Sequence, residues 1–364
     1  MPDRQSVLLL GATGSIGSST IDIIRRFPER FKLAGFSYHS NQVLAKSLAR
    51  EFNCPFFCSS EPSFCWSDIT SIEHDMSIQA IVGAAGVEPS VQLAGTGKKL
   101  LLANKESLVV AGELFNSICE ENGTMVLPAD SEHNSLYRLL QNQEGVKKLV
   151  LTASGGPLRS FSDQEMKQVT KSQVLNHPTW SMGDKITVDS AGLINKALEV
   201  MEAHYLFGLP FEKIDAVIHP QSFVHAAVQA QDGSFRLHVS VPDMKIPLAH
   251  GMFFPKEAPG VEKEIDLDQM QSFTFEKIDK QKFPGFKLGI AAGNAGGIMP
   301  MIFNAANEAA NHAFRQDLIS FSDIAKFIGN KMQERSGDNP VQSLDELLNR
   351  NTEYLNIFAR ELKC

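Results

Sequence analysis

The chain has 364 residues, of which 43% are hydrophobic and 21% charged, a balance typical of a globular protein with two or three domains. This composition excludes a disordered or fibrous protein. The formal net charge of -8 at pH 7 argues against a nucleic acid or an anionic membrane as partner, because both bind basic surfaces.

The cysteines and the N-terminus indicate the compartment. The five cysteines are odd in number and show neither CxxC spacing nor a disulfide framework, which suggests a reducing environment. They are Cys54, Cys58, Cys65, Cys119 and Cys364. An apolar run begins within the first ten residues and leaves no room for a leader peptide, and no apolar stretch reaches the roughly 18 residues that span a bilayer. We expect a cytoplasmic bacterial enzyme, or a plastid enzyme whose leader has been removed.

The first 130 residues alternate short apolar runs with helical patterns. The expected strands are "SVLLL", "FKLAGFS", "IQAIVGAAG", "KLLLAN" and "TMVLPA", and the expected helices are Ile16 to Phe27, "NQVLAKSLAREF" and "ESLVVAGELFNSICEEN". Strands apolar enough to be buried on both faces predict a Rossmann-like, doubly wound parallel sheet over residues 1–129. Ligands of such sheets bind beyond the carboxyl ends of the strands.

A glycine-rich turn follows the first strand. Gly11, Gly14 and Gly17 form a GxxGxxG variant of the dinucleotide fingerprint, in which the backbone approaches a pyrophosphate at a helix N-terminus. Tight packing alone is the alternative explanation. The next strand ends in Ser37, His39, Ser40 and Asn41, where an NAD site would carry an acid. The sequence therefore favours NADPH, although no arginine is present there.

Polar residues follow two later strands. Asn104, Lys105 and Glu106 come after "LLLA", where Lys105 is either a substrate contact or a solvated surface residue. Asp130 and Glu132 follow "TMVLPA", and in an extended segment they would point the same way. Two such carboxylates repel each other unless a cation lies between them, and an oxygen-only set favours Mg²⁺ or Mn²⁺ over zinc. The alternative is a helix start, with Asp130 or Ser131 as N-cap.

The region 130–253 reads as an α+β catalytic domain. In its long helical pattern Asn195 and Lys196 lie on one face with Glu199, which offers a third carboxylate for the metal beside groups for an anionic substrate. A surface salt bridge between Lys196 and Glu199 is the alternative. Ser154, before two glycines, and Ser190, before the long helix, would form a phosphate pocket.

The segment 176–185 is expected to be a lid. His177, Trp180 and Met182 lie there in a loop flanked by proline and glycine, and a closing lid would exclude water during hydride transfer. The alternative is that Trp180 packs on a neighbouring domain. Residues 254–284 are irregular and predict a linker, and 285–364 predict a helical C-terminal domain, with an apolar stripe that includes Ile324 and Ile328.

Eight sequence blocks together resemble one enzyme family. These blocks are "GATGSIG", "LANKESLV", "DSEHNS", "TASGGPLR", "HPTWSMG", "KITVDSA", "NKALEVMEAH" and "HPQSFVHAAV". Their order and spacing are similar to those of 1-deoxy-D-xylulose 5-phosphate reductoisomerases over essentially the whole chain. The resemblance implies a homodimer that rearranges and reduces this sugar phosphate to 2-C-methyl-D-erythritol 4-phosphate, using NADPH and Mg²⁺ or Mn²⁺, with Co²⁺ as a further candidate metal.

The resemblance also implies roles for individual residues. The NADPH contacts would be Thr13, Gly14, Ser15, Ile16, Gly17, Ser37, Ser40, Asn41, Asn104, Glu106 and Gly183. The metal ligands would be Asp130, Glu132 and Glu199, and these would act in catalysis together with Lys105. The substrate contacts would be Lys105, Ser131, Glu132, Ser154, His177, Trp180, Met182, Ser190, Asn195, Lys196 and Glu199.

Some positions depart from the family pattern. Gly192 and Leu193 replace bulkier residues, and Ala129 replaces valine, changes that affect packing only. Asp184 follows the lid where a basic or small residue is common, so it would weaken NADPH binding or point elsewhere. Two other functions remain open at this point. One is an NADPH-dependent dehydrogenase of another phosphorylated hydroxy-ketone, and the other is a non-catalytic dinucleotide-binding module.

Overall fold

The computed structural model describes residues 4–141, 145–180, 182–262, 265–270 and 272–363. Cys364 and one residue of the predicted lid, Ser181, lie outside the described residues. The chain divides into two compact units, each built from several segments. The first comprises Met1–Ser107, Glu113–Tyr137 and Asp243–Ile265, and the second Leu108–Gly112, Arg138–Pro242 and Asp266–Cys364. The division into an NADPH domain, a catalytic domain, a linker and a helical domain stays a prediction.

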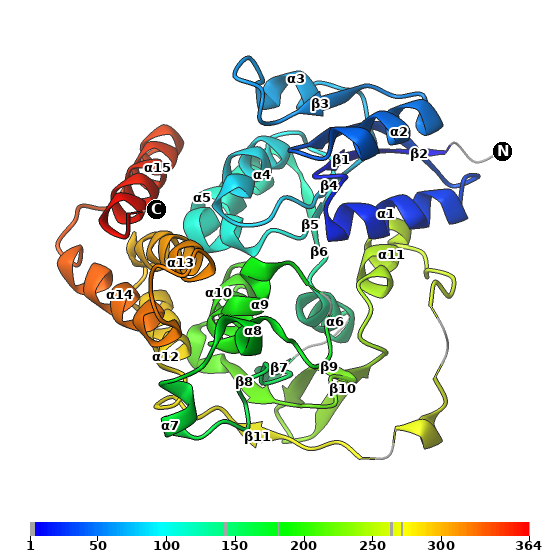
Figure 1. Cartoon of the computed structure of the whole chain (residues 1–364). Helices are drawn as coiled ribbons and strands as arrows, with labels where there is room; N and C mark the ends of the chain where they lie inside the picture. The colour runs from blue at the N-terminus through cyan, green and yellow to red at the C-terminus, as the bar shows by residue number, and fades with distance from the viewer. Residues whose placement is uncertain (1–3, 142–144, 181, 263–264, 271, 364) are drawn as a thin grey trace. The chain divides into compact units, whose positions relative to one another are not determined.

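The first unit contains a parallel six-stranded sheet with the order β3-β2-β1-β4-β5-β6 (Figure 1). Its strands are β1 (Gln5–Leu10), β2 (Phe31–Tyr38), β3 (Phe56–Cys58), β4 (Met76–Gln79), β5 (Lys99–Leu102) and β6 (Met125–Pro128). The helices between them are α1 (Ser15–Arg26), α2 (Gln42–Phe52), α3 (Trp66–Thr70), α4 (Val87–Ala94) and α5 (Lys105–Asn122). The expected Rossmann-like fold is confirmed.

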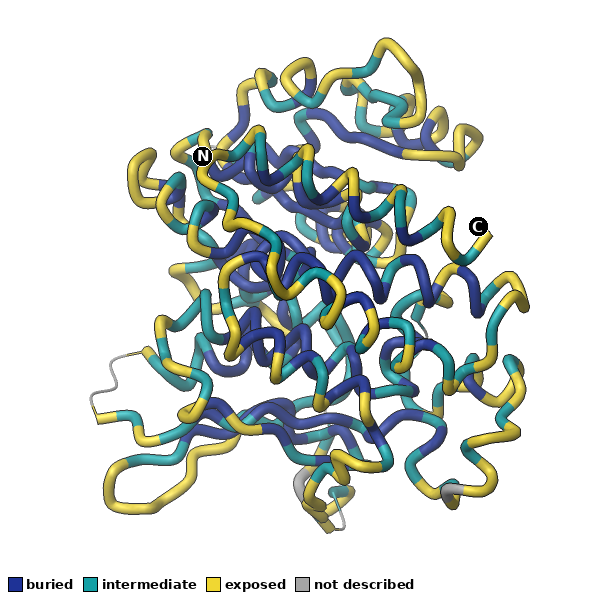
Figure 2. Tube along the Cα trace, turned by 90° about the vertical axis from the view of Figure 1, so that its left-hand side faces the viewer, coloured by how far each residue is buried: buried dark blue, intermediate teal, exposed yellow. Residues whose placement is uncertain are grey.

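Burial explains why these segments form strands. Val7, Leu8, Leu9 and Leu10 of β1 are each 0% exposed, as a central parallel strand covered on both faces requires. Figure 2 shows buried residues gathered along the strands and the inner helices, whereas exposed residues concentrate in the connecting loops. The short β3 and the helices α3 and α4 were not expected, because their apolar residues are too few to give a clear period.

A late segment completes the core of the first unit. Helix α11 (Lys245–Phe253) places Phe253 edge-on against Phe27 and Phe31, with ring centroids 5.1 and 5.0 Å away. The ammonium group of Lys99 donates to the carbonyls of Met252 and Phe254 at 3.0 and 3.1 Å, which satisfies the end of this helix. Residues 243–265 therefore fold with the first unit, although more than a hundred residues separate them from its last strand.

The second unit contains a mixed sheet with the order β10-β9-β7-β8-β11, in which β7 and β8 are parallel and the other pairs antiparallel. Its strands are β7 (Val146–Ala153), β8 (Ile214–Ile218), β9 (Val224–Ala230), β10 (Phe235–Val239) and β11 (Glu276–Lys277). The helices are α7 (Asp163–Met166), α8 (Lys171–Leu175), α9 (Asp184–Ala191), α10 (Ile194–Phe207), α12 (Pro284–Ala295), α13 (Met299–Arg315), α14 (Phe321–Glu334) and α15 (Leu344–Glu361). This arrangement confirms the α+β region and the helical C-terminal part.

Close helix packing fixes α10 within the second unit. A Cβ atom added to Gly289 of α12 would lie 2.5 Å from the Cβ of Ala197 on α10, so only glycine permits this approach. In α14, Ile324 and Ile328 are buried, as the apolar stripe predicted. Among the described residues, no helix combines the length and the apolar composition that crossing a membrane would require.

Candidate active site

The glycine turn lies between β1 and α1. Gly11 has a positive φ of +83°, and a Cβ atom on it would lie 2.9 Å from the carbonyl oxygen of Ala80. A Cβ atom on Gly17 would lie 2.3 Å from the carbonyl oxygen of Gly11. Tight packing therefore accounts for Gly11 and Gly17. Gly14 is different, because it is exposed, has room for a side chain and is the N-cap of α1 with no side chain to satisfy the helix N–H groups.

Ser37 supports the glycine turn from the next strand. Its side chain is buried, and its hydroxyl oxygen accepts the N–H of Gly11 at 3.0 Å. Just beyond it, His39, Ser40 and Asn41 are exposed and include no acid. Asn41 is the N-cap of α2 and accepts the N–H of Leu44. The edge where a cofactor ribose would lie thus carries no acidic residue, and Ser37 supports the glycine turn next to it.

Asn104 connects two strand ends of the first unit. It is 1% exposed, and it is the N-cap of α5 because its side chain accepts the N–H of Ser107. Its amide nitrogen donates to the carbonyls of Ile81 and Gly83, both at 2.9 Å, and to the carboxylate of the buried Glu106. These bonds order the loops after β4 and β5, beside the end of the glycine turn.

Lys105 is not a solvated surface residue. Its ammonium nitrogen lies 2.6 Å from an oxygen of Asp130, and the two side chains are only 11% and 15% exposed. A nearly buried lysine beside a carboxylate at the carboxyl end of a parallel sheet is an arrangement suited to an anionic or metal-bound ligand. The surface alternative for Lys105 is therefore wrong.

The acid pair begins a helix instead of continuing an extended strand. Helix α6 starts at Ser131 and runs to Leu140, and the carbonyl of Asp130 accepts the N–H of Asn134. The expected i and i+2 geometry of a strand is thus wrong, and the helix-start alternative is right. The helix turn still leaves an oxygen of Asp130 and an oxygen of Glu132 within 4.8 Å of each other. The positive end of the helix dipole favours both negative charges.

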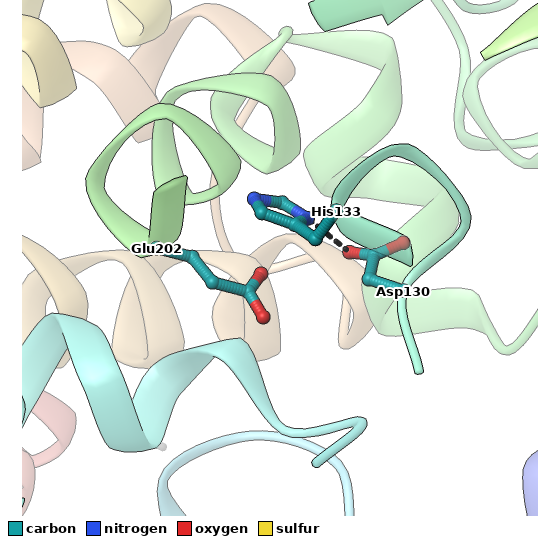
Figure 3. A group of neighbouring side chains, drawn as sticks. All are labelled: Asp130, His133 and Glu202. Carbon is teal, nitrogen blue, oxygen red and sulfur yellow. Dashed lines mark ion pairs between the residues drawn. The ribbon is translucent and has the colours of Figure 1, made fainter. Parts of the chain in front are cut away.

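His133 is a site residue that the sequence did not reveal as one. It is 0% exposed, and its Nδ1 lies 3.9 Å from a carboxylate oxygen of Asp130 (Figure 3). The i, i+3 spacing on a helix would have predicted this contact. That signal was missed because the acids were assigned to an extended segment. At 3.9 Å, Nδ1 of His133 and the oxygen of Asp130 approach each other but lie farther apart than a hydrogen bond allows.

Three residues of α10 form one polar group in the second unit. The amide of Asn195 and the ammonium of Lys196 both donate to the carboxylate of Glu199. Lys196 is 4% exposed and Glu199 2% exposed. The alternative of a surface salt bridge is therefore wrong, whereas the shared helix face is confirmed. A buried ion pair contributes little to stability by itself, which favours a functional reason for keeping it.

Ser154 and His177 form a second polar group in this unit. The Nδ1 of His177 accepts the backbone N–H groups of Thr179 and Trp180, so in the neutral ring the proton lies on Nε2 and points at Ser154 Oγ, 3.1 Å away. Gly156 N–H also donates to Ser154 Oγ. The hydroxyl oxygen is occupied as an acceptor, which leaves the O–H of Ser154 to donate to an anion. Burial lowers the pKa of His177 to about 4, and this keeps the ring neutral near pH 7.

Ser190 lies against the same glycine turn. Gly156 has a φ of +67°, and a Cβ atom on it would lie 2.7 Å from the carbonyl oxygen of Ser190. The Ser154 loop and the end of α9 therefore approach each other as closely as backbone atoms allow. This contact brings the backbone of Ser190 against the loop that carries Ser154, and the phosphate pocket itself stays a prediction.

The predicted lid connects α8 to α9. Met182 is partly buried and Gly183 is exposed as the N-cap of α9. The ring of Trp180 lies 6.3 Å from that of His225 in β9, inside its own unit. Asp184 is the exposed first residue of α9, where the helix dipole favours its charge.

Two of the positions that depart from the family pattern have clear structural settings. Leu193 takes a left-handed φ of +55° directly before α10, and its side chain is 2% exposed. Ala129 is 0% exposed between β6 and α6. Both side chains are buried, so these substitutions concern packing, as expected.

Comparison with known families covers most of the chain. The family profile of 1-deoxy-D-xylulose 5-phosphate reductoisomerase matches residues 7–67 and 65–112, and the profiles of its C-terminal domains match 126–207 and 239–356. The reductoisomerase of Leptospira borgpetersenii is 43% identical over 94% of this chain and 93% of its own length. That of Prosthecochloris aestuarii is 40% identical over 94% of this chain and 96% of its own length.

Solved structures agree with the profiles. A DOX-P reductoisomerase in complex with NADPH, fosmidomycin and magnesium is similar with a TM-score of 0.91 and 35% identity, over 99% of this chain and 98% of that one. The reductoisomerase from Zymomonas mobilis in complex with NADPH gives a TM-score of 0.88 and 33% identity, over 99% of both chains. Sequence and fold together place this chain in the 1-deoxy-D-xylulose 5-phosphate reductoisomerase family.

Proposed function

We propose that this protein converts 1-deoxy-D-xylulose 5-phosphate to 2-C-methyl-D-erythritol 4-phosphate, with NADPH and a divalent metal. The observation that carries the proposal is the pair of preorganised polar groups, one on each unit, in a chain that belongs to the reductoisomerase family. The first group is Lys105 with Asp130, and the second is Asn195 and Lys196 with Glu199.

The metal ligands in this proposal are Asp130, Glu132 and Glu199. The donor set fits Mg²⁺ or Mn²⁺, because it consists of carboxylate oxygens, and the oxygens of Asp130 and Glu132 already lie within 4.8 Å of each other. When bound, the divalent ion polarises the substrate ketone and lowers the pKa of the neighbouring hydroxyl, which permits the carbon skeleton to rearrange. Lys105 would orient Asp130 through their ion pair, and His133 lies near the same carboxylate oxygen.

The substrate phosphate would be bound by neutral donors together with Lys196. The hydroxyl oxygen of Ser154 accepts hydrogen bonds from His177 and Gly156, so its own hydrogen would be available to donate to the phosphate, and the backbone of Ser190 lies against Gly156. His177 holds Ser154 in this state and stays neutral near pH 7. Ser131, Asn195 and Lys105 would contact the sugar oxygens.

NADPH would bind along the glycine turn of the first unit and supply the hydride that reduces the aldehyde formed by the rearrangement. Its contacts would be Thr13, Gly14, Ser15, Ile16, Ser40, Asn41 and Gly183, with Ser37, Asn104 and Glu106 ordering the surrounding loops. Trp180 and Met182 would cover the reacting atoms and exclude water. A chain with no acid at the ribose edge accepts a 2′-phosphate more readily than an acidic one.

The decisive experiment follows NADPH consumption with the sugar phosphate, with and without EDTA, and identifies the product by NMR. The proposal requires metal-dependent oxidation and a branched carbon skeleton in the product. A reduced but unbranched product would instead indicate a dehydrogenase of a phosphorylated hydroxy-ketone. Absence of turnover with intact NADPH binding would indicate a non-catalytic dinucleotide-binding module.

Two variants test the metal ligands of the first unit. Asp130→Asn and Glu132→Gln each remove a charge while keeping the shape of the side chain, and both are expected to abolish turnover and to leave NADPH affinity near that of the wild type. Near-normal kcat in either variant at modest Mg²⁺ or Mn²⁺ would overturn the metal assignment.

The proposal includes a homodimer in the cytoplasm of a bacterium. Strand β10 is an edge of the sheet of the second unit, and its Phe235 and Leu237 are 56% and 42% exposed. An apolar edge strand of this kind is open to pairing with a second copy. Sedimentation velocity should therefore give a dimer, and Phe235→Lys should shift it toward the monomer.

A further inference from the structure

We propose that Asn307 and Asn311 of α13 position Ser190 for substrate binding by anchoring α9 through Asp189. This inference rests on the proposed function, because it concerns how the phosphate pocket is held in place. The sequence "NAANEAANHAFR" places Asn304, Asn307 and Asn311 on one helix face, with spacings of three and four residues. All three side chains are 0% exposed.

Asp189 is a buried carboxylate that needs partners to stay in the interior. It is 1% exposed, and one of its oxygens accepts the side-chain amides of Asn307 at 3.0 Å and Asn311 at 2.8 Å. Its other oxygen lies 3.1 Å from the ammonium of Lys185, which also pairs with Glu308 at 3.2 Å. A buried charge is tolerated only when such partners replace its lost hydration.

Asn311 is the central residue of this network. Its amide nitrogen donates both to Asp189 and to the backbone carbonyl of Lys185, at 2.9 Å, so it contacts α9 at two successive turns. Its side-chain oxygen accepts the Nε–H of Arg315 at 2.9 Å, which fixes the orientation of the amide. The rotation of α9 about its axis is therefore set by α13.

The consequence reaches the pocket through the next residue in the chain. Ser190 follows Asp189 directly, and its carbonyl lies against Gly156 in the loop that carries Ser154. Helix α9 has only eight residues, and a helix this short has little stability without packing against other elements. Without the anchor at Asp189, a small rotation of α9 would move the Ser190 hydroxyl away from the phosphate. Asn311 is thus a positioning residue that acts through Ser190.

Asn304 provides a matched control on the same helix. It is equally buried, yet within the described part of the chain neither of its side-chain polar atoms has a hydrogen-bond partner. Asn311→Ala and Asn304→Ala therefore remove identical atoms and leave similar cavities, but only the first removes hydrogen bonds to α9. Asn311→Ala is the larger perturbation of the two, because it removes a hydrogen-bond donor from the buried, charged carboxylate of Asp189.

The test measures KM for the sugar phosphate, the inhibition constant of inorganic phosphate, kcat and Tm. Asn311→Ala should raise KM and the phosphate inhibition constant together by about tenfold, and Asn304→Ala should change neither by more than about twofold. The same measurements are made in a Ser190→Ala background, where Asn311→Ala should have no further effect on KM if it acts through Ser190.

The inference is overturned if Asn311→Ala lowers Tm but leaves KM and phosphate inhibition unchanged, since a merely structural role predicts that result. It is also overturned if Asn311→Ala raises KM equally in the Ser190→Ala background. Failure of the proposed function would look different, because the wild-type protein itself would then not turn over the sugar phosphate.

Discussion

Glu199 offers the sharpest separation of stability from catalysis, because its carboxylate is buried in an ion pair with Lys196 and is also proposed to bind the metal. Glu199→Gln keeps the shape of the side chain but removes the negative charge that the ammonium of Lys196 contacts, in a site where the two residues are 4% and 2% exposed. Removing one partner of a buried ion pair costs about 3–5 kcal/mol. At about 2–4 °C for each kcal/mol, we expect Tm to fall by roughly 6–20 °C.

The catalytic effect should be distinguishable from this loss of stability. In the double variant Lys196→Met/Glu199→Gln, the ammonium group is replaced by an apolar chain of similar length, so most of the lost Tm should return. Turnover should not return, because the carboxylate proposed to bind the metal is still absent. Asn195 is unchanged in both variants, so the helix keeps its neighbouring hydrogen-bonding group.

Thermal unfolding is recorded in EDTA, so that metal binding does not contribute to Tm, and turnover is recorded across a titration of Mg²⁺ and Mn²⁺. NADPH affinity serves as the control for folding and should stay within about threefold of the wild type. An unchanged Tm in Glu199→Gln would refute the burial argument. Near-normal kcat in the single or the double variant would refute the role of Glu199 in the metal site.

Three further predictions concern the pocket and the lid. Trp180→Ala should raise substrate KM while Tm changes little, and a large fall in Tm with unchanged KM would instead support a packing role. The pKa of His177 is lowered from 6.5 to about 4 by burial, so the unfolded chain takes up a proton that the folded protein does not, and stability should fall as pH drops from 6.5 toward 4. His177→Asn should flatten this part of the Tm profile, and an unchanged slope would contradict the assignment. Gly156→Ala should cost about 1–3 kcal/mol and raise KM, whereas Gly208→Ala, with a similar positive φ but open space, should show the backbone cost alone.

Local patterns in the sequence predicted the elements of the first unit well. The boundaries expected for β1, β5, α2 and α5 agree with the structure within one or two residues, because apolar strands and glycine or asparagine caps are local signals. The local pattern failed at the acid pair. There the choice between an extended segment and a helix depended on whether the carbonyl of Asp130 would accept the N–H of Asn134.

The sequence identified the candidate residues by their type and order, but it did not predict whether their side chains are buried or exposed. From the sequence alone, Lys105 could have been a solvated surface residue, and Lys196 and Glu199 could have formed a surface salt bridge. The burial of these side chains rejected both explanations. Burial depends on which segments pack over a side chain, and that information is spread along the whole chain.

The sequence by itself determined the kind of protein this is: a parallel dinucleotide-type sheet, an oxygen-rich acid pair, and motif blocks in the order of one enzyme family. Only the tertiary structure assigned residues 243–265 to the first unit, buried the ion pair on α10, and joined α9 to α13 through Asp189. The physical reason is the distance along the sequence between the residues that interact. The alternation of apolar residues and the helix caps depend on neighbours within a few residues, whereas the energy of a buried charge depends on partners far away in the sequence.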